Sequence, residues 1–418
     1  MATRVADADA CETGMAEADQ PPIAAMESEE GPSVALTLRL GRKVGEGTSG
    51  QVSVWRDAID GGHYVVKRVP LKNTDKSSLL HEVRIHRECS AGCAAIVRYA
   101  FSNMTAEELV VGMEACDCVL WDILVSADGQ LGELEQGRAG AVALQRFSLA
   151  RDVAQAVAHC HDLGIIHRDI NPWNIFLIRG GGQSAAFYSA KLGDFGLSAK
   201  LRYNDENLTG VKGNEDVPPL DDSALGSLYS APELGHTYGL PADVFSLGMV
   251  FLVLWATSVS QNEDQLITHV EMAKTAAQQG TQMDWQWFHR SDKFGPADLE
   301  LLELLSEMVL GEPKARPTAA TVFTTLDSFD QSHICDTKTR VQVCFDRCGF
   351  NTKIPKDSLA KIINALKLGP NATEVILKAF GSPTNQGQPQ EGPHTSDSID
   401  LEKFLDWVFM SSSEGCTQ

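Results

Sequence analysis

The sequence predicts an α+β fold with a small strand-rich lobe, a larger helical lobe and a small all-helical unit near the C-terminal end. Between residues 36 and 113, short apolar runs alternate with turn residues such as Asp60-Gly61-Gly62, which is typical of an antiparallel sheet. From residue 147 the apolar positions recur with helical period. After residue 335, two helix–loop–helix patterns are separated by a loop rich in Gly, Pro, Gln and Ser at 381–398.

Composition limits the class of function. The 418 residues carry a formal net charge of −21, so neither nucleic acid nor a membrane is an expected partner, because both favour basic surfaces. The ten cysteines lack the spacing of a disulfide framework or a zinc site. We therefore expect reduced thiols and a cytoplasmic or nuclear location.

Three segments divide the chain. Residues 1–36 are acidic, with few large apolar groups, which predicts a disordered tail. Residues 37–329 carry the regular patterns and 335–418 form the small helical unit. Within the second segment, the apolar run 244–259 is shorter than a membrane span and predicts a buried central helix.

The small lobe is predicted to contain one helix among its strands. The helix covers Ser77 to Cys89, and its expected apolar side consists of Leu79, Leu80, Val83 and Ile85. The strands are expected around residues 36–40, 52–55, 63–66, 96–99 and 109–113.

A glycine-rich turn lies between the first two strands, in Gly45-Glu46-Gly47-Thr48-Ser49-Gly50-Gln51-Val52. Glycines let a main chain approach phosphate closely because they have no Cβ atom. Strand-like runs lie on both sides and no helix follows, which favours a phosphate-covering hairpin over a dinucleotide-binding turn.

Lys67 ends an apolar strand inside this lobe. A lysine there is either a solvated surface residue or one held by a counter-charge. Glu82, on the predicted helix, supplies such a charge, and Glu88 is the alternative partner. Paired in this way, the ammonium would contact the α- and β-phosphates of a nucleotide.

Three ordered strings follow in the helical lobe: His167-Arg168-Asp169 with Asn174, then Asp194-Phe195-Gly196, then Ala231-Pro232-Glu233. Asp169 is suited to accept a proton from a substrate hydroxyl. The oxygens of Asn174 and Asp194 are suited to Mg²⁺, a hard cation. Any one of these residues could instead be an ordinary turn residue, but their order and spacing favour a catalytic set.

Arg168 also predicts control by the polar loop at 201–222, because an arginine next to a catalytic aspartate needs an anion to fix it in place. A phosphate on a loop hydroxyl or a loop carboxylate would serve. The candidates are Thr209, Ser223, Ser227, Glu215, Asp216, Asp221 and Asp222.

With these strings in place, residues 37–329 resemble a eukaryotic protein kinase catalytic domain of the serine/threonine type. The resemblance implies the two-lobed kinase fold, ATP and Mg²⁺ as cofactors, and protein hydroxyls as acceptors. It implies that Met113 is the gatekeeper, that Glu114 and Cys116 bind adenine through the main chain, and that Val52 covers it. It also implies that Asp243 caps the catalytic loop, and that Glu233 pairs with Arg316.

One position departs from that family's pattern. Asn171 stands two residues after the catalytic aspartate, where the family has a lysine that stabilises the transferring phosphoryl group. Asparagine keeps a donor but loses the cation, and one such contact is typically worth ~10²–10³ in rate. An active kinase is expected, which is either slow or compensated by Lys200 or another cation. The alternative is a pseudokinase that serves as a nucleotide-binding scaffold.

The C-terminal unit resembles a pair of EF-hands of the calmodulin type. Phe345-Asp346, Ile354 and the helix from Lys356 to Lys367 match the first, and residues 399–404 match the second. Position 12 of a calcium loop requires a glutamate, but here it is Ser358 in one loop and Lys403 in the other. Ca²⁺ is therefore not expected, and the unit would instead bind an amphipathic peptide helix, from this chain or from a partner.

Overall fold

The structure is a computed structural model. It describes residues 38–329 apart from gaps at 48–49, 58–61, 73–74, 126–138, 180–187, 202–219, 221–224, 237 and 292, together with 353–355 and 398–400. The predicted acidic tail lies outside the described residues, and so does most of the predicted EF-hand-like unit. The chain divides into two compact units. The second contains 330–418 with two earlier segments, 136–145 and 179–188, and the first contains the remainder.

Five antiparallel strands form the sheet of the first unit, in the order β1-β2-β3-β5-β4 (Leu38–Gly47, Gly50–Asp57, His63–Pro70, Glu108–Glu114 and Tyr99–Met104). Alternation along the strands divides the side chains between two faces. Trp55, Val66, Phe101 and Val110 form one apolar cluster. Val69, Leu71, Leu109 and Val111 form another. The predicted strand-rich lobe is therefore present.

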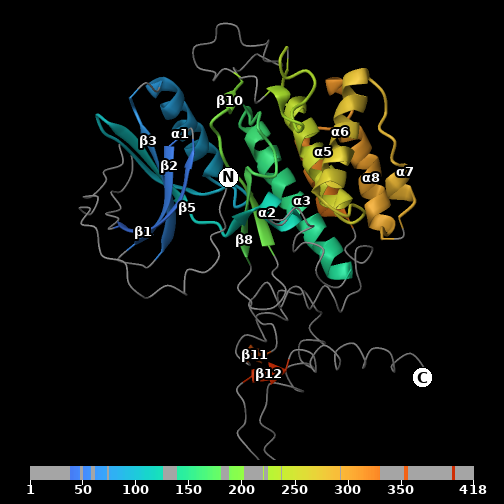
Figure 1. Cartoon of the computed structure of the whole chain (residues 1–418), viewed down its shortest axis with the longest axis horizontal. Coiled ribbons are helices and arrows are strands. Elements are labelled where there is room, and N and C mark those ends of the chain that lie inside the picture. The colour runs from blue at the N-terminus through green and yellow to red at the C-terminus, as the bar shows by residue number, and fades with distance from the viewer. Residues whose placement is uncertain are drawn as a thin grey trace, which may run out of the picture. The chain divides into compact units, whose positions relative to one another are not determined.

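Helix α1 (Lys76–Ser90) packs against this sheet (Figure 1). It begins where Asp75 accepts a hydrogen bond from the main-chain N–H of Ser77 at 3.0 Å. The prediction for Leu80 was wrong, because this side chain is 50% exposed. Leu80 lies on the same exposed face as Arg84, one turn along the helix. The buried face of α1 instead includes His81 and His86.

The predicted strand at 96–99 is displaced along the chain. Only Tyr99 belongs to a strand of the sheet, β4, while Ile96 forms an isolated parallel bridge with Leu192. Its neighbour Val97 donates its main-chain N–H to Leu192 at 2.9 Å. The start of the apolar run is therefore buried as expected, but Ile96 and Val97 pair with the segment before Asp194. The run reaches the sheet only from Arg98 on, where the Arg98 carbonyl oxygen accepts from the main-chain N–H of Glu114 at 3.0 Å.

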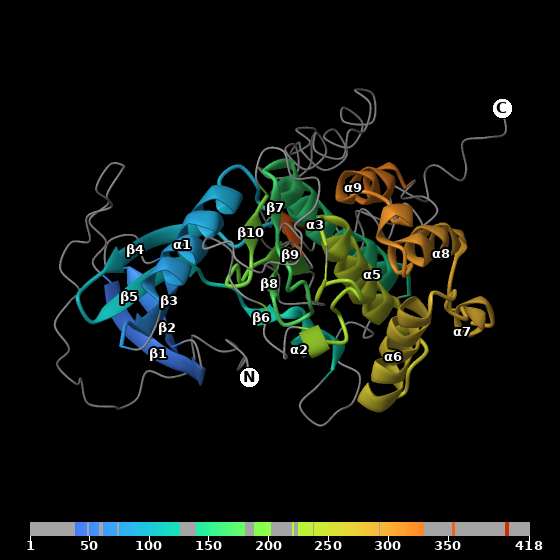
Figure 2. The same ribbon diagram turned by 90° about the horizontal axis from the view of Figure 1, so that it is seen from above.

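Most of the remaining elements before residue 330 are helical. The long helices are α3 (Ala139–Asp162), α5 (Pro241–Ala256), α6 (Glu263–Gln279), α8 (Pro296–Met308) and α9 (Ala319–Ser328). Figure 2 shows α5, α6 and α8 grouped away from the five-stranded sheet. Every residue of α5 from Ala242 to Ala256 is buried, so the predicted central helix is confirmed. No helix of the described residues is long and apolar enough to cross a membrane.

Short elements complete this unit and carry the candidate site residues. They are helices α2 (Leu120–Leu124) and α7 (Gln286–His289), the sheet β6-β8-β9 (Cys118–Val119, Ile175–Arg179 and Tyr188–Leu192), and the pair β7-β10 (Ile165–Ile166 and Ala199–Lys200). Together with the sheet and helices above, they form the two-lobed fold that the sequence predicted.

In the second unit, β11 (Lys353–Pro355) pairs antiparallel with β12 (Ser398–Asp400). The register places Ile354 opposite Ile399. Both lie in the segments that resemble EF-hand loops, and they are separated by more than forty residues of chain. The two loop-like segments are thus brought together by main-chain pairing.

Candidate active site

The glycine-rich segment forms the hairpin between β1 and β2. Gly45 pairs with Val52, Glu46 with Gln51, and Gly47 with Gly50. The pairing is irregular just before Gly45, which bends the strand where the glycines begin. The segment is therefore a hairpin, as predicted, and strand β3 rather than a helix is the next element described.

The alternation of β3 directs Lys67 toward α1. Lys67 has the same parity as Val69 and Leu71, whose cluster is covered by apolar residues of α1. Its ammonium donates to Oε1 of Glu82 at 2.9 Å, so the predicted pair is present. Burial acts against the charge of Lys67, but Glu82 and then Asp194 outweigh it and raise the pKa. The lysine therefore remains charged at neutral pH.

Glu88, the alternative partner of Lys67, pairs instead with Lys200, the cation expected to compensate for Asn171. Lys200, on β10, donates to Oε1 of Glu88 near the end of α1. Both side chains are at least one-third exposed. In this structure the Lys200 ammonium is directed to Glu88, and its role as a compensating cation for Asn171 stays a prediction.

The catalytic loop is fixed by the buried carboxylate of Asp243, as the sequence predicted. The main-chain N–H of His167 donates to Oδ2 at 2.7 Å and that of Arg168 to Oδ1 at 2.9 Å. His161 Nε2 lies 3.0 Å from Oδ2. Burial opposes the charge of Asp243, but these bonds and charges lower its pKa overall. The carboxylate therefore sets the position of the loop that carries Asp169.

The side chains of Asn171 and Asn174 both turn toward Asp169. Asn171 donates from Nδ2 to Oδ1 of Asp169 at 2.8 Å, and Asn174 donates to Oδ2 at 2.7 Å. The other end of Asn171, Oδ1, accepts from the main-chain N–H groups of Trp173 and Asn174. Burial raises the pKa of Asp169 and these donors oppose the rise. Asn171 is thus a structural link of the loop as well as a neighbour of the carboxylate.

Asp194 is held in an unusual backbone conformation. Its φ is 62°, and Arg168, with φ 68°, is the other non-glycine residue with positive φ in the described part of the chain. Such conformations are costly and cluster at functional sites. Arg168 and Asp194 belong to two of the three predicted catalytic strings. The side chain of Asp194 is exposed.

Phe195, next to Asp194, is buried against rings from two other segments. It stacks on His86 of α1 with centroids 5.3 Å apart, and it lies 5.0 Å from the ring of His167. His86 Nε2 is 2.7 Å from the carbonyl oxygen of Val97. Burial lowers the pKa of His86, so the neutral ring donates this bond. The ring contacts join α1, the Asp194 segment and the catalytic loop.

Arg168 finds oxygen partners outside the loop predicted to control it. Its Nε donates to the carbonyl oxygen of Leu197 at 2.5 Å, and NH1 donates to the hydroxyl of Tyr238 at 2.8 Å. Of the predicted loop anions, Thr209, Glu215, Asp216, Asp221, Asp222 and Ser223 lie outside the described residues. Ser227 is described, and its hydroxyl accepts from the main-chain N–H of Tyr229 at 3.3 Å.

The predicted adenine-binding residues lie at the end of β5 and just beyond it. Met113 and Glu114 are its last two residues. The Glu114 carboxylate accepts from the main-chain N–H of Arg98 at 2.5 Å and pairs with Lys191 at 2.9 Å. Cys116 is buried, which raises its pKa to about 12, so it is an unreactive thiol at neutral pH. Glu114 therefore ties this connection to β9.

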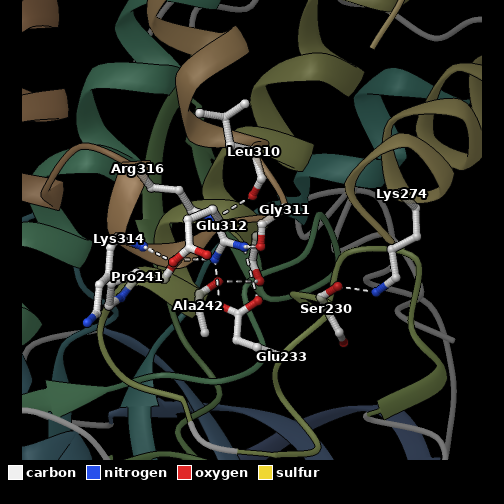
Figure 3. Close-up of polar contacts among 11 residues, drawn as sticks. Ser230, Glu233, Pro241, Ala242, Lys274, Leu310, Gly311, Glu312, Lys314 and Arg316 are labelled. Atoms are coloured by element: carbon white, nitrogen blue, oxygen red, sulfur yellow. Dashed lines mark hydrogen bonds and ion pairs between the residues drawn. The ribbon is translucent and has the colours of Figure 1, made fainter. Parts of the chain in front are cut away.

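Two buried cations hold the segment around the third string (Figure 3). Arg316 makes the predicted bidentate pair with Glu233, at 2.6 and 3.0 Å. Lys274 of α6 donates to the carbonyl oxygens of Ser230 and, at 3.3 Å, Ser227. Both cations also lie over the ring of Phe245, at 5.0 and 5.9 Å from its centroid. The segment from 227 to 233 is thereby fixed at both ends.

The residues brought together fit ATP and Mg²⁺. Lys67 supplies a charged ammonium for phosphate, and the hairpin supplies glycines. Asn174 uses its amide nitrogen on Asp169, which leaves its oxygen for a metal, and the Asp194 carboxylate is exposed. Two protein oxygen ligands suit Mg²⁺, which is usually bound by one or two carboxylates together with substrate phosphates.

Sequence reasoning missed four residues that shape this region: His86, Lys191, Tyr238 and Lys274. Each acts through a partner distant in the chain, as in the contact of Lys274 with Ser230 forty-four positions away. No local spacing marks such contacts. His86 did carry a usable signal, because it lies four residues after Glu82 and therefore on the same face of α1.

The comparisons agree with this geometry. Residues 38–326 match the family model described as the protein kinase domain. Calcium-dependent protein kinase 27 of Oryza sativa subsp. japonica is 29% identical over 293 residues, covering 67% of this chain and 40% of the relative. Mitogen-activated protein kinase kinase kinase 4 of Mus musculus is 30% identical over 231 residues, covering 52% of this chain and 12% of the relative.

These relatives are longer proteins, and this chain spans less than half of each. The family match itself extends across the hairpin, the catalytic loop and the segment fixed by Arg316, which are the parts whose geometry is described above. The chain belongs to the protein kinase family.

Proposed function

We propose that this chain is an active serine/threonine protein kinase that transfers the γ-phosphoryl group of ATP·Mg²⁺ to protein hydroxyls. The observation that carries the proposal is the Lys67–Glu82 pair at 2.9 Å, with the charge of Asp194 close enough to raise the pKa of Lys67. A counter-charged lysine beside an exposed carboxylate is the arrangement that phosphoryl transfer requires, because positioning and electrostatics supply most of the catalysis.

Each side chain has a distinct role in this proposal. Lys67 binds nucleotide phosphate, and Asn174 and Asp194 hold Mg²⁺, which would neutralise charge on the phosphates. Asp169 orients the acceptor hydroxyl and receives its proton. Asp243 keeps the loop in place through the main-chain N–H groups of His167 and Arg168. The serine/threonine preference rests on the segment just before Ala231-Pro232-Glu233, which is Gly226-Ser227-Leu228-Tyr229-Ser230. It resembles serine/threonine kinases, because tyrosine kinases usually carry a basic, tryptophan-containing segment there.

The test uses the purified full chain, radiolabelled ATP, Mg²⁺ and a generic protein substrate, followed by phosphoamino-acid analysis. We expect label on serine or threonine, and none with Asp169→Asn. Equal labelling by the variant and the wild type would refute the assignment of Asp169. Label on tyrosine would refute the serine/threonine assignment while leaving the kinase proposal intact.

A second candidate is a nucleotide-binding scaffold that has lost catalysis. One observation favours it: both oxygens of Asp169 already accept hydrogen bonds, one from Asn171 and one from Asn174. The Asn171 amide is thus engaged with Asp169 and brings no positive charge to the transferring phosphoryl group. This candidate predicts that the wild type binds ATP but transfers no label, and that Asn171→Lys gains activity from near zero.

For residues 335–418 we propose an EF-hand-like pair that binds a peptide helix without requiring Ca²⁺. The pairing of Ile354 with Ile399 supports it, because both residues stand four places before position 12 of their loops, which is Ser358 in one and Lys403 in the other. Several relatives are named calcium-dependent protein kinases, so calcium regulation is the direct alternative. Calorimetry of the full chain with CaCl₂ tests this. Saturable heat at micromolar calcium would refute the calcium-free proposal.

A further inference from the structure

One large aromatic side chain is exposed beside the catalytic loop. Trp173 is 42% exposed, and among the described residues four other large apolar side chains are classed with it as exposed: Leu80, Leu225, Met272 and Leu299. Exposed single aliphatic residues are common on protein surfaces. An exposed indole is less so, because it leaves a wide apolar face in water.

Trp173 is held rigidly by two other aromatic residues. Trp121 of α2 stacks on it, with centroids 4.6 Å apart and planes inclined by 29°. Tyr229 meets it edge-on at 5.9 Å and 84°. Tyr229 is 6% exposed, and burial raises its pKa well above the usual range. The three rings come from three separate segments and form a preorganised surface, here called the aromatic platform.

The platform is linked directly to the group that receives the substrate hydroxyl. The main-chain N–H of Trp173 donates to Oδ1 of the Asn171 side chain at 3.0 Å. Nδ2 of the same side chain donates to Oδ1 of Asp169 at 2.8 Å. Trp173 lies four residues after Asp169, and an extended chain spans at most about 3.6 Å per residue. The two residues are therefore no more than about 14 Å apart.

This distance decides what can lie on the platform. A substrate chain with its hydroxyl at Asp169 extends about 3.3 Å per residue. A substrate side chain that contacts Trp173 therefore belongs to a residue within about four positions of the phosphorylated one. The faces of the three rings are apolar, and a large apolar side chain that packs on them removes apolar surface from water. A guanidinium can also lie over an aromatic ring, so Arg is the competing side chain that the experiment must include.

We propose that the aromatic platform of Trp173, Trp121 and Tyr229 binds a large aliphatic or aromatic side chain of the protein substrate, within four positions of the phosphorylated residue. The inference rests on the proposed function and names the substrate class of the same site. Trp and Tyr are the side chains that most often dominate binding at such surfaces.

The experiment uses a positional-scanning peptide array with the full-length protein and labelled ATP·Mg²⁺. Each peptide has a central serine, and one position from −4 to +4 is set to Leu, Phe, Ala or Arg. We expect Leu or Phe to be preferred over Ala about tenfold at one position, which corresponds to about 1.4 kcal/mol. Trp173→Ala should abolish the preference, Trp173→Phe should retain part of it, and Trp173→Glu should shift it toward Arg. Leu299→Ala, which alters an equally exposed side chain on α8, should leave it unchanged.

A second measurement separates this inference from the kinase proposal. Fluorescently labelled peptides with Ala in place of the serine are titrated with each variant, and binding is followed by anisotropy. The inference holds if the Leu or Phe peptide binds wild type more tightly than Trp173→Ala, even if no label is transferred. It is overturned if the variants bind alike, or if wild type prefers Arg.

Discussion

Asn171 donates a hydrogen bond from Nδ2 to Oδ1 of Asp169 at 2.8 Å, in the position from which the family's lysine would reach the transferring phosphoryl group. The amide replaces a mobile cation with a short, neutral side chain. Its other end holds the main-chain N–H groups of Trp173 and Asn174 at 3.0 and 3.2 Å. The residue therefore maintains the loop while supplying no positive charge.

From this arrangement we expect Asn171→Lys to raise kcat. One transition-state contact is typically worth ~10²–10³ in rate, and the lysine must also give up the loop contacts of the asparagine, so a gain of about tenfold to a hundredfold is expected. Steady-state phosphorylation of a generic substrate measures it. Asn171→Ala is the matched control, which removes the same loop contacts without adding charge and should lower kcat. A lysine variant no faster than the alanine variant would contradict the interpretation.

The second prediction concerns Lys67 and Glu82. Replacing Lys67 with Met removes the cation expected to hold the phosphates, so we expect kcat/KM for ATP to fall by ~10²–10³. Glu82→Gln should cause a smaller loss in the same direction. In a double-mutant cycle the two losses should not add, because both variants break one interaction at 2.9 Å.

The neighbouring residue of β3 provides the control. Arg68 pairs with Glu108 at 2.6 and 3.1 Å, and its side chain is 28% exposed against 18% for Lys67. A partly exposed pair of this kind contributes about 0–1 kcal/mol. Arg68→Met should therefore leave kinetics nearly unchanged. If it impairs ATP use as much as Lys67→Met, then general destabilisation of the sheet, and not lost phosphate binding, explains both.

How much of this site could be predicted depends on the distance over which each residue acts. Lys67, Asp169 and Asp194 are found from short strings, because the chemistry fixes residue types at close spacing. The run at 96–99 was misassigned because β-branched residues signal burial but not the identity of the hydrogen-bond partner. The aromatic platform depends on Trp121, Trp173 and Tyr229, which only the folded chain brings together.

The third prediction concerns the capping carboxylate. Asp243→Asn replaces an acceptor of two main-chain N–H groups with a group that must turn its own NH₂ toward one of them. Hydrogen bonds to a charged group are worth about 1.5–3 kcal/mol, so we expect the free energy of unfolding to fall by about 2–3 kcal/mol. Urea denaturation measures the change, and activity should fall too because the loop loses its anchor.

The pH dependence of this difference has a definite sign. The pKa of Asp243 is lowered from 3.8, so its contribution is present above that pH and is lost as the pH falls through its folded value. The difference in the free energy of unfolding between wild type and Asp243→Asn should therefore be constant near neutral pH and become smaller at acidic pH. Asp298, a buried carboxylate bonded to Trp255 and Gly295, is the control. Asp298→Asn should destabilise the protein without a comparable loss of activity.

The last prediction concerns Lys274, whose ammonium is buried against Ser227, Ser230 and the ring of Phe245. Burial lowers its pKa to about 8, and Glu233 opposes part of that shift. The unfolded chain, in which the lysine has a pKa near 10.5, therefore binds more protons than the folded chain between these values. The contribution of Lys274 to the free energy of unfolding must then increase as the pH rises from about 8 to 10.5.

Lys274→Met removes the titrating group and leaves the two carbonyl oxygens without their donor. At pH 7 we expect it to change the free energy of unfolding by no more than about 1–3 kcal/mol, since the buried charge it removes is itself costly. As the pH rises from 8 to 10.5, wild type should gain up to about 3 kcal/mol relative to the variant. Urea denaturation of both proteins at several pH values measures this, and parallel curves would show that Lys274 titrates normally. Because the segment it holds carries Tyr229, the variant should also raise KM for peptide more than it lowers kcat.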